Sequence, residues 1–164
     1  MVSMREPAAA RSSGAGARPG SPDPDLILET VVIEMMDRAS PDRMPMDVLI
    51  VEDDPIIALD FEDTILGFGV TQVRTAGSVA QALDLIGGRV PDFALLDVGL
   101  VREKSFAIAE RLRALQIPFV FVTGYGAEVR LPATFADRPR LPKPCSREAL
   151  QAALRCNSGD GARR

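Results

Sequence analysis

The sequence predicts an α/β fold in which helices cover both faces of a parallel sheet. From Asp47 onward, short apolar runs alternate with segments of helical periodicity. The runs are hydrophobic at consecutive positions, which is typical of parallel strands buried on both faces. The chain has 164 residues and 46% hydrophobic content, enough for one good core but too little for two full domains.

The first strand and helix are expected to meet at Asp54. The run DVLIVE, residues 47–52, is an apolar segment of strand length. Asp54 then supplies an N-cap, Pro55 takes the first helical position, and Gly67 and Gly69 end the helix. The buried face of this helix is predicted to carry Ile57, Phe61, Ile65 and Phe68.

Two further strand and helix pairs follow. The run VTQVRTA, residues 70–76, is the second strand, and Ser78 with Gln81 forms a capping box for the next helix. The run PDFALLDV, residues 91–98, is the third strand, and another helical pattern follows it. The apolar faces of these two helices are expected to carry Val79, Leu83 and Ile86 in the first, and Phe106, Ala109, Leu112 and Leu115 in the second.

A fourth strand, a short fifth strand and a final helix complete the pattern. The run PFVFVTG, residues 118–124, is dense in β-branched and aromatic residues. Residues 126–140 contain Pro132 and Pro139 and little helical periodicity, so the fourth helix should be short or replaced by loop. Ser146 then caps a helix with Leu150 and Leu154 on its apolar face.

Residues 1–45 are expected to be mostly disordered, because they hold six of the 13 prolines and cannot bury enough apolar surface. Within them, residues 25–38 have apolar residues at helical spacing and predict a short helix, either a docking helix or a transient one. The alternative is a translated upstream extension, with Met44 or Met46 as the true start. We expect residues 46–156 to form the folded domain and residues 157–164 a flexible tail.

Charge and composition exclude several classes of function. The net charge of -4 and the isoelectric point near 4.9 give no basic surface for nucleic acid or an anionic membrane. Without histidine, the chain cannot form a Ser-His-Asp triad, a Cys-His pair or a phosphohistidine relay. No apolar run reaches the ~20 residues of a membrane helix and no secretory signal is visible, so we expect a cytoplasmic protein.

Chemically reactive residues stand at the carboxyl ends of the predicted strands. Glu52 and Asp53 close the first strand, Asp97 closes the third and Thr123 closes the fourth, while Lys143 follows the short fifth segment. Ligands of an open parallel sheet bind beyond these ends. We therefore expect these side chains to gather at one edge of the sheet.

The types of these residues indicate Mg²⁺-dependent phosphoryl chemistry. Neighbouring carboxylates would raise one another's pKa unless a hard cation joined them, and Mg²⁺ prefers oxygen ligands. Lys143 supplies a point charge and Thr123 a hydroxyl, and both suit the oxygens of a transferring phosphoryl group. Asp97 is then left as the nucleophile.

Four motifs carry a resemblance to a known family. VLIVEDDP, FALLDV, FVTG and LPKP, in this order and spacing, resemble the receiver domain of two-component response regulators, from Asp47 to about Arg155. The resemblance implies a flavodoxin-like (CheY-like) fold with a five-stranded parallel sheet and helices on both faces. It also implies that Asp97 is the phosphoacceptor and shares Mg²⁺ with Glu52 and Asp53.

The same resemblance assigns further residues. The backbone carbonyl of Gly99 would be another metal ligand, Thr123 and Lys143 would contact the phosphoryl group, and the peptide bond from Lys143 to Pro144 would be cis. The run PFVFVTGYG, residues 118–126, resembles the FATGUY subclass, with Val122 where the subclass name has Ala. This subclass is usually linked to histidine kinases of the HWE or HisKA2 type in alphaproteobacteria.

The chain departs from the usual family pattern at Arg140. Receivers commonly place Tyr or Phe three residues before the lysine as a rotameric switch, and Arg140 stands there instead. Tyr125 lies between Gly124 and Gly126, whose backbones are unusually free to reorient. We therefore expect Tyr125 to carry the switch. The alternative is that Tyr125 packs beside the site and influences hydrolysis of the acyl phosphate.

Three functions are compatible with these residues. The favoured one is a single-domain response regulator, which accepts a phosphoryl group on Asp97 from a partner histidine kinase and signals through an unknown protein partner or acts as a phosphate sink. Such a protein is a phosphoacceptor rather than a turnover enzyme. The alternatives are a phosphorylation-independent pseudo-receiver adaptor and a Mg²⁺-dependent phosphohydrolase, which would need a general acid where Gly99 stands.

Overall fold

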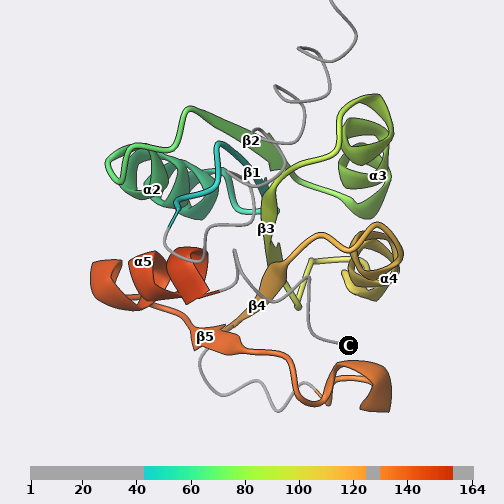
Figure 1. Ribbon diagram of the computed structural model, residues 1–164. Helices are drawn as coiled ribbons and strands as arrows, with labels where there is room; N and C mark the ends of the chain where they lie inside the picture. The colour runs from blue at the N-terminus through green and yellow to red at the C-terminus, as the bar shows by residue number, and fades with distance from the viewer. Residues whose placement is uncertain (1–42, 125–129, 157–164) are drawn as a thin grey trace, which may run out of the picture. The chain divides into compact units, whose positions relative to one another are not determined.

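The structure is a computed structural model that describes residues 43–124 and 130–156. In this part of the chain, five strands form one parallel sheet in the order β2-β1-β3-β4-β5 (Figure 1). The strands are β1 (Asp47–Val51), β2 (Gln72–Ala76), β3 (Phe93–Asp97), β4 (Phe119–Thr123) and β5 (Arg140–Pro142). The predicted α/β fold with a five-stranded parallel sheet is confirmed.

Helices cover both faces of the sheet, and each face has its own core. The helices are α2 (Pro55–Leu66), α3 (Val79–Gly88), α4 (Phe106–Ala114) and α5 (Arg147–Cys156). α2 and α5 lie on one face, and α3 and α4 on the other (Figure 1). Successive residues of β1 point to opposite faces, so Leu49 and Val51 join the core under α3 and α4, while Val48 and Ile50 join the other core.

The two edge strands are more exposed than the sequence predicts. The first four residues of β2 are half-buried, and the first and last residues of β5 are exposed. The prediction of strands buried on both faces therefore holds for β1, β3 and β4 but is wrong for β2 and β5. Each edge strand has a neighbour on one side only and lies at the margin of the helical layers, so solvent reaches its side chains.

Local hydrogen bonds fix where α2 and α3 begin. Asp54 Oδ1 accepts from the N–H of Ile56 at 2.8 Å, and Ser78 Oγ accepts from the N–H of Gln81 at 3.2 Å. Gln81 Oε1 accepts from the N–H of Gly77 at 2.9 Å. The predicted capping box is therefore correct for Ser78, but the return bond goes to the residue before the cap rather than to the cap itself.

The connection between β4 and β5 was predicted to hold either a short helix or a loop, and its described part holds one short turn. Among residues 130–139, the only helical segment is the 3-10 turn η1 (Ala133–Phe135). Phe135 is buried and packs edge-to-face against Phe119 and Phe121, with ring centroids 6.0 and 5.7 Å away. In the described part of this connection, loop therefore stands in place of a helix between β4 and β5, as predicted.

Several predictions concern residues outside those that the structure describes. These are the helix over residues 25–38, the switch residue Tyr125 and the tail over residues 157–164. The predicted domain boundaries stay a prediction. Within the described residues, no helix is both long enough and apolar enough to cross a membrane.

Candidate functional site

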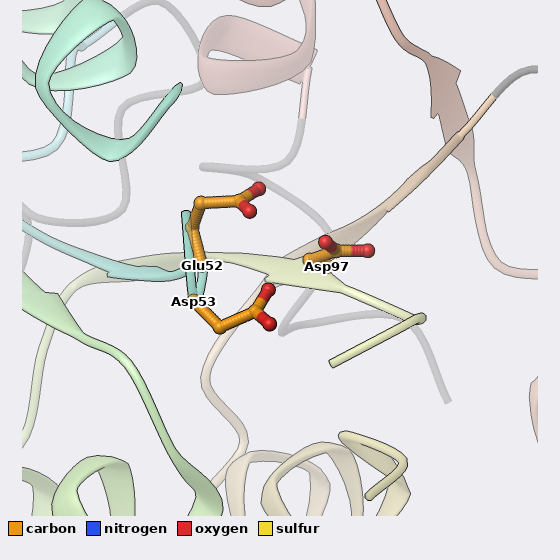
Figure 2. A group of neighbouring side chains, drawn as sticks. All are labelled: Glu52, Asp53 and Asp97. Carbon is orange, nitrogen blue, oxygen red and sulfur yellow. The ribbon is translucent and has the colours of Figure 1, made fainter. Parts of the chain in front are cut away.

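Three acidic side chains converge at the carboxyl edge of the sheet. Glu52 and Asp53 directly follow β1, and Asp97 is the last residue of the neighbouring β3. One carboxylate oxygen of each lies within 4.8 Å of the others, and Figure 2 shows the three side chains close together. The structure thus brings together the three carboxylates that were predicted to bind Mg²⁺.

Lys143 is the counter-ion of two of these carboxylates. Glu52 and Asp97 are only 4% and 7% exposed. Lys143 Nζ donates to Asp97 Oδ2 at 2.8 Å and also to Glu52 Oε2. The sequence motifs assign Lys143 to the phosphoryl group alone and do not predict its pairing with the two carboxylates. A usable signal existed, because buried carboxylates need a nearby cation.

Burial and hydrogen bonding act in opposite directions on this cluster. Burial raises the pKa of Glu52 above its ordinary value, and hydrogen bonds from Lys143 and from the N–H of Asp54 offset that effect only in part. Burial by itself lowers the pKa of Lys143, but hydrogen bonds to Asp97 and Glu52 outweigh it and raise the pKa. Lys143 is therefore held in its charged form at neutral pH.

Backbone N–H groups orient the carboxylates. The N–H of Gly99 donates to Asp97 Oδ1 at 2.9 Å, which fixes the plane of that carboxylate. The N–H of Val101 donates to Asp53 Oδ2 at 3.0 Å. The sequence gives no sign of the role of Val101, because a contact between residues 48 positions apart leaves no local pattern.

Thr123 and the Lys143–Pro144 bond also lie at this edge. Thr123 is the half-buried last residue of β4 and pairs in register with Pro142 of β5. The N–H of Lys143 donates to the carbonyl of Thr123 at 2.8 Å, so the backbones of the two residues are tied together. The peptide bond from Lys143 to Pro144 is cis, the geometry that the family resemblance implies.

Arg140 lies at the surface rather than beside the acidic group. It is exposed, and its guanidinium donates to the carbonyl of Ala136 at 3.4 Å. This contact directs the side chain towards the β4–β5 connection. The place that the family commonly gives to an aromatic switch therefore holds a solvated charge.

The donor set fits a hard divalent cation. Carboxylate oxygens are the ligands that Mg²⁺ takes in proteins, with waters and phosphate oxygens completing its octahedral shell. Asp53 is only half-buried, so solvent and ions reach the group from that side. Glu52, Asp53 and Asp97 are the residues that would hold the ion, and its charge would offset that of phosphoryl oxygens.

The family model for the response regulator receiver domain matches residues 48–155. The chain belongs to this family. Receiver domains of two-component systems are phosphorylated by histidine kinases, and phosphoaspartate and Mg²⁺ are typical of them. The receiver assignment made from the motifs is confirmed, while the FATGUY subclass and the HWE or HisKA2 kinase type stay predictions.

This receiver domain is similar to the phyllosphere-induced regulator PhyR of Methylorubrum extorquens, with 29% identity over 85 residues. That match covers 50% of this chain and 32% of PhyR, so the chain spans about a third of that relative. The solution structure of SdrG from Sphingomonas melonis Fr1 is 42% identical, with a TM-score of 0.61, over 68% of this chain and 94% of that one. The BeF3-activated conformation of SdrG from Pseudomonas melonis Fr1 is 39% identical, with a TM-score of 0.58, over the same shares of the two chains.

Proposed function

We propose that this receiver domain acts as a single-domain response regulator, which accepts a phosphoryl group on Asp97 in a Mg²⁺-dependent reaction. The observation that supports this function is that Asp97 lies beside Glu52, Asp53 and Lys143 at the carboxyl edge of the sheet, where Thr123 ends the neighbouring strand β4. A partner histidine kinase supplies the phosphoryl group, and the FATGUY-like motif favours a kinase of the HWE or HisKA2 type.

Two contacts of the Asp97 carboxylate support its proposed role as the nucleophile. Its Oδ1 accepts from the N–H of Gly99 and its Oδ2 from Lys143 Nζ. A carboxylate oxygen of Asp97 bonds to phosphorus as the bond from phosphorus to the donor's leaving nitrogen breaks, and an acyl phosphate results. Lys143 and the Thr123 hydroxyl then bind phosphoryl oxygens, because a charged amine and a hydroxyl both donate hydrogen bonds to them.

The metal ligands in this proposal are Glu52, Asp53, Asp97 and the backbone carbonyl of Gly99. Bound Mg²⁺ supplies positive charge against the phosphoryl oxygens. An ion held by Glu52 would offset the charge of that carboxylate, which Lys143 otherwise contacts. The amine of Lys143 would then be available to the phosphoryl group, so one lysine would serve both the resting and the phosphorylated protein.

The phosphorylated chain acts on a protein partner in the cytoplasm, or it drains phosphate from a shared kinase. In either role Asp97 accepts a phosphoryl group, water later hydrolyses the acyl phosphate and regenerates the carboxylate, and the chain is not a turnover enzyme. Tyr125 takes over the switch, because Arg140 directs its charged group to the surface. These assignments rest on the sequence motif together with the position of Arg140.

A second function, that of a phosphorylation-independent adaptor, is favoured by one observation. Lys143 pairs with both Glu52 and Asp97, so these two carboxylates have a cationic partner that the chain itself provides. An adaptor would keep this pairing permanently and present a fixed surface to its partner.

Incubation with acetyl phosphate and Mg²⁺, followed by intact mass spectrometry, tests the proposed function. We expect the wild-type protein to gain the mass of one phosphoryl group. This gain should not occur when a chelator removes Mg²⁺ from the incubation, and it should not occur in Asp97→Asn. Labelling that survives in Asp97→Asn would place the nucleophile elsewhere. No labelling by acetyl phosphate or by any histidine kinase would favour the adaptor.

A further inference from the structure

The connection between β3 and α4 is a closed turn beside the acidic group. Gly99 and Lys104 form an antiparallel bridge, and the N–H of Glu103 donates to the carbonyl of Leu100 at 3.3 Å. Leu100 is buried in the core under α3 and α4, whereas Val101 next to it is 84% exposed. The turn over residues 99–104 is therefore anchored by one apolar side chain and otherwise faces solvent.

Two hydrogen bonds tie this turn to distant parts of the chain. On one side, the N–H of Val101 donates to Asp53 Oδ2 at 3.0 Å. On the other side, Glu103 Oε1 accepts from the N–H of Val79 at 2.8 Å. The turn is thus held between the end of β1 and the beginning of α3.

The contact of Glu103 with Val79 has a clear physical basis. Val79 is the first residue of α3, and its N–H is one of those that a helix leaves without an internal partner. The Ser78 side chain caps Gln81 instead, so Glu103 satisfies a donor that the local cap does not. A carboxylate at this end of a helix also interacts favourably with the helix dipole.

We propose that Glu103 is a positioning residue for the Mg²⁺ site, holding the turn against α3 so that Val101 orients Asp53 and Gly99 stays beside Asp97. This inference rests on the proposed Mg²⁺-dependent function. The hydrogen bond on Asp53 Oδ2 leaves the other oxygen of that carboxylate for the ion. Glu103 itself does not belong to the acidic group, and it acts through the backbone of the turn.

Contacts that orient metal ligands have a large effect on how tightly the metal binds. Loss of such an outer partner typically weakens metal binding by about 10- to 100-fold. Glu103 acts one step farther out than Val101, so its removal should give an effect of about tenfold, at the lower end of that range. A turn that is already ordered also loses less conformational freedom when the ion binds.

Mg²⁺ titration by calorimetry tests the inference on four full-length proteins: wild type, Glu103→Ala, Glu103→Gln and Glu110→Ala. We expect the Kd for Mg²⁺ to rise about tenfold in Glu103→Ala, and to return close to wild type in Glu103→Gln, whose amide oxygen still accepts from Val79. Glu110 is an exposed glutamate of α4 and controls for the loss of one negative charge, so Glu110→Ala should bind like wild type.

Acetyl phosphate labelling over a range of Mg²⁺ concentrations gives a second readout. Glu103→Ala should label more slowly than wild type at low Mg²⁺ and at the same rate when Mg²⁺ saturates the site. A lowered rate at saturating Mg²⁺ would show that Glu103 acts on the chemical step and would overturn the assignment.

Three further results would also contradict the inference. An unchanged Kd in Glu103→Ala with a lower melting temperature would make Glu103 only a cap for α3. An equal rise of Kd in Glu110→Ala would reduce the effect to net charge. Wild type that neither binds Mg²⁺ nor becomes phosphorylated would overturn the proposed function and the inference together, and it is recognised without any variant.

Discussion

Lys143 is the shared counter-ion of two carboxylates that the fold buries at the ends of β1 and β3. Its side chain is 17% exposed, and those of Glu52 and Asp97 are 2% and 8% exposed. Charges this far from water interact strongly, and removing one partner leaves the other uncompensated. Lys143 therefore stabilises the resting protein, in addition to its proposed role at the phosphoryl group.

Lys143→Met should lower the free energy of unfolding by about 3 kcal/mol in the presence of a chelator, because two buried carboxylates lose their cation. Saturating Mg²⁺ should restore part of this loss, since the ion takes over the neutralisation. Urea unfolding with chelator and with Mg²⁺ measures both effects. Lys104→Met, at an exposed lysine, is the matched control and should change little. Equal losses in the two variants would contradict the pairing.

A second buried ion cluster lies at the opposite, amino edge of the sheet. Asp47 is 2% exposed and receives two hydrogen bonds from Arg74, at 3.0 and 2.9 Å. Arg89 approaches the same carboxylate at 3.1 Å. The side chains of the two arginines differ in exposure, 13% for Arg74 and 61% for Arg89.

These exposures predict unequal effects of two similar substitutions. Arg74→Gln should lower the free energy of unfolding by about 3 kcal/mol, because it leaves Asp47 buried without its main partner. Arg89→Gln should change it by less than about 1 kcal/mol, as for an exposed ion pair. Urea unfolding of both variants measures the difference. Similar losses in both would mean that burial does not govern this cluster.

At the scale of whole elements, features that depend on neighbouring residues in the sequence were predicted better than features that depend on residues far apart in the chain. Asp54 was assigned as the cap of α2 because a cap and its N–H lie within a few residues of each other. The exposure of β2 and β5 depends on strand order, which the hydrophobicity of a single run does not contain. The contacts of Asp53 with Val101, and of Lys143 with Glu52, join residues far apart in the chain. The family motifs predict that the acids and the lysine share one site. They do not predict which group each of these side chains contacts there.

The β4–β5 connection gives a prediction for one element. Phe135→Ala should lower the free energy of unfolding by about 3 to 4 kcal/mol, because it opens a cavity beside Phe119 and Phe121. It should also speed amide exchange across residues 130–139, which lose their buried anchor. Urea unfolding and hydrogen exchange measure the two effects.

Phe68→Ala serves as the control for this element, because Phe68 is a half-buried ring on the other face of the sheet. It should lower stability by less and leave exchange across residues 130–139 as in wild type. Unchanged exchange in Phe135→Ala would show that the connection is held by something other than this ring.

At the scale of the whole sheet, the amino edge and the carboxyl edge differ in how their charges are balanced. The amino edge carries the cluster around Asp47, whose charges are paired with arginines. The carboxyl edge holds three carboxylates, those of Glu52, Asp53 and Asp97, and the single positive charge of Lys143 does not neutralise them all. Binding of a cation at that edge should therefore be linked to folding, because a ligand that binds only the folded chain stabilises it.

Mg²⁺ at 100 times its Kd should raise the free energy of unfolding of wild type by about 2.7 kcal/mol. Asp53→Asn should lose most of this gain, because its amide can still accept a hydrogen bond from Val101 but brings no negative charge to the ion. Arg89→Gln should keep the full gain, since Arg89 contacts the cluster at the other edge. Thermal and urea unfolding at constant ionic strength measure these differences, with NaCl replacing Mg²⁺ in the reference. Equal gains in wild type and Asp53→Asn would mean that the ion binds elsewhere on the chain.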